Sequence, residues 1–186
     1  IRDKETMQAA IAYAQTGHLC LATLHANNSY HALNRIISFF PLEVRPMLLQ
    51  DLSVSLKAIV SQRLVRTVDG KRTPAVEVLL NTRNVQEAIE KGEVGEVKEM
   101  MEKSMSPGSQ TFEQDLFRLV RIGKVATDEA LANADSATNL GLLLGNSGIM
   151  PAMAERAKGA MPGKAPGGPS FSEFKIAEEP SEPRFG

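Results

Sequence analysis

Two histidines with an apolar run between them are the residues best suited to chemistry in this sequence. His18 and His25 bracket residues 19–24, and small polar residues follow at 27–29. In open parallel sheets, ligands bind beyond the carboxyl ends of the strands. If residues 19–24 form such a strand, Thr23 and His25 lie at its ligand-binding end. A histidine there can donate to a phosphate oxygen, because its charge and tautomer respond to small changes near neutral pH.

His18 is expected to have a different task from His25. At about 3.3 Å per residue, a straight strand separates the two backbones by roughly 23 Å, so both rings cannot meet one phosphate. We predict that His18, next to Gly17, ties the helix-to-strand turn or faces a neighbouring subunit. The spacing alone also allows a plainer interpretation, in which both histidines are strand-end residues satisfied by backbone groups.

Metal and thiol chemistry are not favoured. A zinc site built from His18, His25 and His31 lacks a carboxylate or thiolate at the spacing that would complete it, so no metal site is predicted. Cys20 lies inside the apolar run, and an apolar setting disfavours the reactive thiolate. We therefore expect Cys20 to be a buried structural residue and not a nucleophile.

Length and charge limit the classes of function. The chain has 186 residues, of which 42% are hydrophobic and 23% charged, with a formal net charge of −1. This suits one globular domain with an appendage, and the near-zero charge gives no electrostatic case for nucleic acid as a partner. A single cysteine, with no signal peptide and no long apolar run in the sequence, fits a cytosolic compartment. The abrupt start at Ile1 reads as a piece of a longer protein.

Hydrophobic periodicity predicts a helix, a buried strand and two further helices in the first sixty residues. Asp3 can cap the first helix, which Gly17 ends, although the spacing leaves Asp3 and Glu5 open as an acid/base pair. The continuous apolar run is typical of a strand covered on both faces of a parallel sheet, and with the preceding helix it makes half of a βαβ unit. Further helices are expected over 32–40 and 48–60.

The pattern then changes from helix to strand. Two alternating runs, 63–68 and 75–80, flank Asp69-Gly70, which is a turn signal for an antiparallel hairpin. The predicted fold class is therefore α/β, with a parallel sheet, an antiparallel hairpin and a helical region after it.

Helical spacing resumes after the hairpin and continues almost to the tail. Thr111 and Gln114 make a capping box, and short helices are expected at 127–133 and 136–144. Six prolines and five glycines among the 36 residues at 151–186 indicate disorder. We predict three parts: an α/β part at 1–81, a helical subdomain at 82–145 and a disordered Pro/Gly-rich tail at 146–186.

Three segments, in order, resemble the hexameric motor ATPases of secretion systems and type IV pili. I-R-D-K-E-T at residues 1–6 resembles the end of their Walker B signature, G-E-I/M-R-D-x-E-T. T-G-H-L-C-L-A-T-L-H at 16–25 resembles their His box, and A-I-V-S-Q-R-L at 58–64 is similar to the motif that follows it. The ordered co-occurrence makes the resemblance specific, and it covers about residues 1–145.

Several features favour the retraction branch of this family, the PilT/PilU type. The Q-R-L segment leads into a hairpin without cysteine, whereas pilus-assembly and type II secretion ATPases commonly have a cysteine-rich zinc module there. Q-T-F-E-Q at 110–114 fits both members of the branch. The PilT retraction helix A-I-R-N-L-I-R-E is N-V-Q-E-A-I-E-K here, at 84–91, without either arginine. That change, with residues 18–28, 35–41 and 134–137, resembles PilU most.

The resemblance implies the C-terminal half of a RecA-like P-loop ATPase core, with ATP and Mg²⁺ bound between subunits or domains. It implies that His25 contacts or senses the γ-phosphate, with Thr23 beside it, and that Arg2 and Asp3 orient the catalytic carboxylate or bridge to the next helix. That glutamate would precede Ile1, and no G-x-x-x-x-G-K-S/T loop occurs in the sequence. This chain alone is therefore expected to be inactive.

The resemblance also implies partners and a location. We expect a homohexamer, a PilT-like motor subunit and the inner-membrane platform protein of the pilus as partners, at the cytoplasmic side of the pilus base. Three alternatives stay open. They are a non-hydrolysing adaptor that acts with a PilT-like motor, an assembly or type II secretion ATPase, and a short structural module without a nucleotide site.

Overall fold

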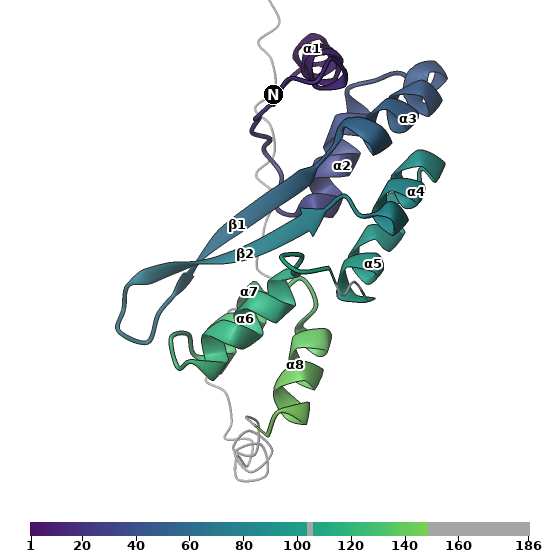
Figure 1. Ribbon diagram of the computed structural model, residues 1–186. Coiled ribbons are helices and arrows are strands. Elements are labelled where there is room, and N and C mark those ends of the chain that lie inside the picture. Colours follow the sequence, from purple (N-terminus) through teal and green to yellow (C-terminus); the bar gives the residue numbers. More distant parts are fainter. Residues whose placement is uncertain (104–105, 149–186) are drawn as a thin grey trace, which may run out of the picture. The chain divides into compact units, whose positions relative to one another are not determined.

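The computed structural model describes residues 1–103 and 106–148, which form helices around one antiparallel hairpin (Figure 1). Within this part no helix is long and apolar enough to cross a membrane. The elements, in chain order, are α1 (Lys4–Gln15), α2 (Ser29–Ser38), η1 (Leu42–Val44), α3 (Arg45–Ser55), β1 (Ala58–Arg66), β2 (Arg72–Leu80), α4 (Arg83–Lys91), η2 (Val94–Glu96), α5 (Val97–Lys103), α6 (Phe112–Arg121), α7 (Thr127–Asn133) and α8 (Ala137–Asn146).

Helix α1 begins and ends where the sequence predicts. The Asp3 carboxylate accepts a hydrogen bond from the backbone N–H of Thr6 at 2.8 Å, which caps the helix and lowers the pKa of Asp3. Met7 and Ile11 are buried on one face. The chain leaves the helix at Gly17, whose φ of +88° favours glycine because it has no Cβ.

The strand predicted at residues 19–24 is not formed. The segment has no regular secondary structure and pairs with no strand within the described residues, whose one sheet is the two-stranded hairpin. Leu19 and Leu21 are 84% and 88% exposed, and Cys20 is exposed too, so the prediction of a buried thiol is wrong. An apolar run indicates a buried strand only if neighbouring strands cover it, and the described part of the chain supplies none.

Helix α3 is shorter than predicted. It ends at Ser55, and Ile59 and Val60 belong to β1 instead of to the helix. Both residues are β-branched and lie opposite Leu79 and Val78 in the antiparallel ladder. The spacing of the apolar residues favours a helix at residues 59 and 60, whereas β-branched side chains favour a strand. Pairing with β2 stabilises the strand.

The hairpin and its turn are confirmed. Strands β1 and β2 pair in register from Ala58 opposite Leu80 to Arg66 opposite Arg72, with Asp69-Gly70 in the turn. Alternate residues of β2 face the interior, and one of them, Glu77, is only 2% exposed. A carboxylate in that inward series needs partners, because burying an unpaired charge is costly.

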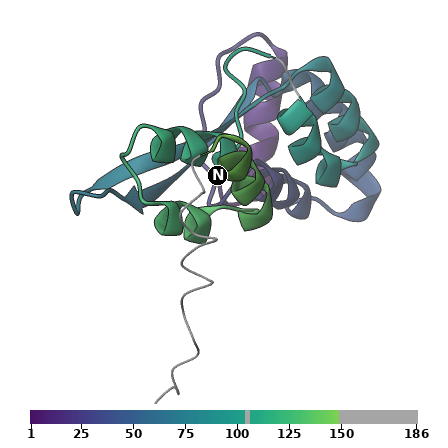
Figure 2. The same cartoon turned by 90° about the horizontal axis from the view of Figure 1, so that it is seen from below.

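Helices from both halves of the described chain build one core. Met7, Leu33 and Leu52 share a cluster with Val85 and Ile89, which lie beyond the hairpin. Helices α6 and α7 contact the hairpin, and in Figure 2 they gather around it with α8. The capping box and the helices α7 and α8 are as predicted. The division at residue 81 stays a prediction, and residues 149–186 of the predicted tail lie outside the described residues.

Candidate functional site

His25 ends an extended segment and opens the loop of residues 26–28 that leads into α2. Its side chain is exposed, and no hydrogen bond or ion pair joins it to another described residue. Thr23 is also exposed, and its carbonyl accepts a hydrogen bond from the N-terminal ammonium group of Ile1 at 2.5 Å. This contact brings Arg2 and Asp3, both exposed, close to the segment that carries Thr23.

His18 lies at the opposite end of that segment and has local partners. Its Nδ1 is 3.0 Å from the hydroxyl of Thr16, and its ring meets the ring of Tyr13 edge-on, with centroids 5.8 Å apart. Its backbone N–H donates to the carbonyl of Tyr13 at 3.1 Å. These contacts suit a residue that ties the turn at Gly17. Its subunit-contact alternative stays a prediction.

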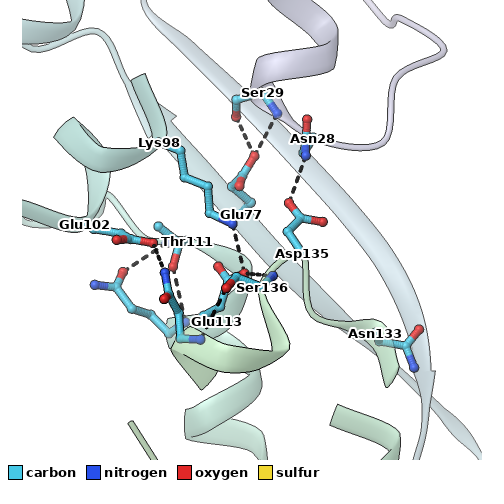
Figure 3. Close-up of polar contacts among 12 residues, drawn as sticks. Asn28, Ser29, Glu77, Lys98, Glu102, Thr111, Glu113, Asn133, Asp135 and Ser136 are labelled. Carbon is cyan, nitrogen blue, oxygen red and sulfur yellow. Dashed lines mark hydrogen bonds and ion pairs between the residues drawn. The ribbon is translucent and has the colours of Figure 1, made fainter. Parts of the chain in front are cut away.

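The loop after His25 is held by two carboxylates from distant parts of the chain (Figure 3). The Asn28 side chain accepts a hydrogen bond from the His31 backbone N–H at 2.9 Å, which caps α2, and donates to Oδ2 of Asp135 at 2.8 Å. The N–H and the hydroxyl of Ser29 both donate to Oε1 of Glu77 at 2.7 Å. The position of the loop is therefore fixed by side chains far away in the sequence. Asp135 is 107 residues from Asn28, and Glu77 is 48 residues from Ser29.

Arg63 of β1 joins the loop to the turn between α7 and α8. Its guanidinium donates to the Asn133 carbonyl at 2.6 Å, to Oδ1 of Asp135 at 2.5 Å and, more weakly, to the Asn27 carbonyl at 3.3 Å. The same group lies over the Phe112 ring, 3.8 Å from its centroid. A planar guanidinium suits this position because it can donate in several directions and stack at once.

Two further buried carboxylates, Glu113 and Asp115, belong to the first turn of α6. Oε1 of Glu113 accepts hydrogen bonds from Lys98 at 2.9 Å and from the backbone N–H of Ser136 at 2.7 Å, while Oε2 has no partner among the described residues. Asp115 accepts from the backbone N–H of Val76 at 2.9 Å and from Arg118 at 2.8 Å. The beginning of α6 is thus bonded to α5, to β2 and to the α7–α8 turn.

The two carboxylates that hold the loop differ in their proton affinity. Burial raises the pKa of Glu77, although the hydroxyl and N–H of Ser29 act in the opposite direction. Burial acts to raise the pKa of Asp135 as well, but hydrogen bonds from Asn28 and Arg63 outweigh it and leave that pKa lowered. Asp135 is therefore held as a carboxylate, which is the form that accepts from both partners.

A polar pocket of about 360 Å³ opens beside the loop. Its lining includes Asn27, Asn28, His31, Arg63 and Asp135, but neither His25 nor Thr23. In residues 1–103 and 106–148 no group of three or more histidine, cysteine, aspartate or glutamate side chains could hold a metal ion. The exposed His25 ring is free to meet an anionic ligand such as a phosphate, whereas Mg²⁺ finds no cluster of ligands in this part of the chain.

Sequence reasoning selected His25, Thr23, Arg2 and Asp3, and the Ile1–Thr23 contact brings their two segments together. It did not identify the supporting carboxylates, Glu77 and Asp135 among them. A signal for Glu77 does exist in the sequence, because a glutamate at an inward position of an alternating strand requires a buried partner. Asp135 follows a helix end and has no comparable signal.

Comparisons with known proteins identify the family of this chain. Residues 1–96 match the family model described as type II/IV secretion system protein. Because these residues make up more than half of the 186, the chain belongs to that family. The family predicted from the motifs is confirmed.

Particular relatives refine this assignment. The type IV pilus ATPase PilU of Pseudomonas aeruginosa is 52% identical over 145 residues, which are 77% of this chain and 38% of PilU. The retraction ATPase PilT of the same organism is 31% identical over 134 residues, 72% of this chain and 39% of PilT. A crystal structure of the pilus retraction motor PilT with bound ADP matches with a TM-score of 0.65 and 31% identity, over 73% of this chain and 38% of that one.

The likeness to PilT confirms the predicted α/β fold class. The chain spans somewhat more than a third of the length of these relatives, at 38% of PilU and 39% of PilT.

Proposed function

We propose that this chain forms part of an ATP-hydrolysing motor that powers type IV pilus retraction, of the PilU kind. The observation that carries the proposal is the 52% identity to PilU over 145 residues, with 31% to PilT. The bound ADP in the related PilT structure supports nucleotide as the ligand. Because the chain spans 38% of PilU, the ATPase activity belongs to a polypeptide that also contains the remaining parts.

In this proposal His25 contacts the γ-phosphate. Its ring is exposed and lacks a partner among the described residues, so it can donate to a phosphate oxygen without breaking an existing bond. Thr23 shapes the same edge, and Arg2 and Asp3, brought near by the Ile1–Thr23 contact, orient the catalytic carboxylate. Such a site works by positioning and by stabilising charge, and not through covalent chemistry.

Mg²⁺ neutralises phosphate charge when ATP is bound. No cluster in the described residues offers it ligands, so we assign its ligands to other parts of the motor, along with the phosphate-binding loop. We propose a homohexamer that works with a PilT-like subunit and the pilus platform protein at the cytoplasmic face of the inner membrane. The absence of both arginines from residues 84–91 supports cooperation with such a second motor subunit.

The test is ATP hydrolysis by the full-length polypeptide that carries this chain, with His25→Ala compared to the parent. We expect kcat to fall by about 100-fold or more, the range in which loss of one electrostatic contact to a transition state lies. His31→Ala is the matched control, since His31 is also exposed but lies on α2. Hydrolysis that persists at the parent rate in His25→Ala would remove His25 from the mechanism. Absence of hydrolysis in the parent, alone or with a PilT-like subunit, would refute the motor.

A further inference from the structure

Asn28 ends the loop of residues 26–28, called here the His25 loop, and its side chain binds both helix α2 and Asp135. Its side-chain oxygen caps α2 through the N–H of His31, and its side-chain nitrogen donates to Asp135 at 2.8 Å. Only Ala26 and Asn27 separate it from His25. A displacement of Asp135 therefore acts on the loop three residues from the histidine, through a single side chain.

Asp135 is in turn held where several elements meet. Arg63 bonds its other oxygen at 2.5 Å, and both side chains are largely shielded from water, at 23% and 18% exposure. Arg63 also reaches the carbonyls of Asn27 and Asn133, so it touches the loop and the α7–α8 turn directly. A charge-assisted pair in such a setting is stronger than an exposed one, because solvent screens it less.

The turn that carries Asp135 is anchored on its other side. The next residue, Ser136, donates its backbone N–H to Glu113, and Glu113 also binds Lys98 of α5 (Figure 3). Helices α5, α6 and α8 thus meet at the same turn. The turn is a point at which movement of the helical region would reach the loop.

We propose that Asp135 is a positioning residue that sets the place of the His25 loop through Asn28 and couples that loop to the helices α5 to α8. The inference rests on the proposed function, because a phosphate contact by His25 gives the loop position its importance. If the contact between Asn28 and Asp135 only stabilised the fold, its loss would lower stability without changing turnover of the folded protein.

Two substitutions isolate the contact. Asn28→Asp keeps the cap on α2, because aspartate caps as well as asparagine, but places a second carboxylate against Asp135. The exchange Asn28→Asp with Asp135→Asn restores an amide-to-carboxylate hydrogen bond in the reverse direction. It also removes the ion pair between Arg63 and Asp135, so the recovery expected from it is partial. Asp128→Asn is the control, since Asp128 is an exposed carboxylate of α7 in the same region.

The first measurement is amide hydrogen exchange of residues 26–32 in the 186-residue chain. We expect about tenfold faster exchange in Asn28→Asp, the loss of one hydrogen bond to a charged group, and recovery in the double variant. Parent-like exchange in Asn28→Asp would overturn the proposal. So would equal acceleration in Asp128→Asn.

The second measurement is ATP hydrolysis by the full-length polypeptide. We expect Asn28→Asp to lower kcat by about tenfold while KM for ATP stays within about twofold, with rescue in the double variant. Loss of turnover in His25→Ala together with parent turnover in Asn28→Asp would overturn this inference alone. Parent turnover in His25→Ala would remove His25 from the mechanism and would overturn the part of this inference that links the loop position to turnover. Absence of hydrolysis in the parent would instead refute the proposed motor, and the hydrogen-exchange result would still decide whether Asp135 positions the loop.

Discussion

Replacing Arg63 by lysine tests whether the geometry of the guanidinium, and not its charge, holds the loop and the helical region together. Lysine keeps the positive charge but is a compact donor that cannot reach carbonyls and a carboxylate in three directions or stack on Phe112. We expect Arg63→Lys to lose two of the three hydrogen bonds, worth about 1 kcal/mol each, and about 1 kcal/mol of stacking. The free energy of unfolding should therefore fall by about 2–4 kcal/mol.

The assay for Arg63→Lys is urea unfolding of the chain, followed by far-ultraviolet circular dichroism. With a slope of about 1–3 kcal/mol per molar urea, the midpoint should fall by about 0.7 M or more. Arg66→Lys is the matched control, because Arg66 is exposed on the same strand, and it should change stability by less than about 0.5 kcal/mol. If the two variants unfold at the same midpoint, the geometric argument for Arg63 is refuted.

Two further predictions concern a turn and a buried acid. Gly17→Ala should lower the free energy of unfolding by about 1 kcal/mol, because the φ of +88° at this position is unfavourable for alanine. No atom would crowd the added Cβ, so the backbone conformation is the whole cause. An unchanged urea midpoint would contradict this. For Glu77, the raised pKa means that the folded protein holds the proton more tightly than the unfolded chain, so stability present at low pH is lost as pH rises through the raised value. Glu77→Gln does not titrate and should lack that loss, while glutamine can still accept from Ser29. Urea midpoints measured across a pH series test this, and parallel curves for parent and variant would count against it.

Local signals in the sequence predicted the elements whose stability is local. Asp3 as a helix cap, Asp69-Gly70 as a hairpin turn and the Thr111–Gln114 capping box all act within four residues of themselves, so each could be recognised without the fold. The segment at 19–24 failed for the complementary reason. Its pattern describes a covered strand, and the cover has to come from elsewhere.

The candidate site shows the same division. His25 and Thr23 could be chosen because they follow an apolar segment, but the side chains that hold their loop come from far along the sequence. Arg63 and Asp135 are 72 residues apart, and Asn28 and Asp135 are 107 apart. No periodicity encodes pairings of that range, since they depend on how the helices dock.

The exposed segment at 19–23 affects how the isolated chain behaves in solution. The backbone of residues 19–22 makes no hydrogen bond to the described residues, and Leu19 and Leu21 project into water. An extended apolar segment with free N–H and C=O groups is a template on which a second strand can add, which favours self-association and aggregation. Cys20 stands between those leucines and is exposed. The Cys20 thiol should be alkylated rapidly while residues 19–22 are exposed and more slowly once a neighbouring strand covers them. The rate of alkylation therefore measures how completely this segment is covered.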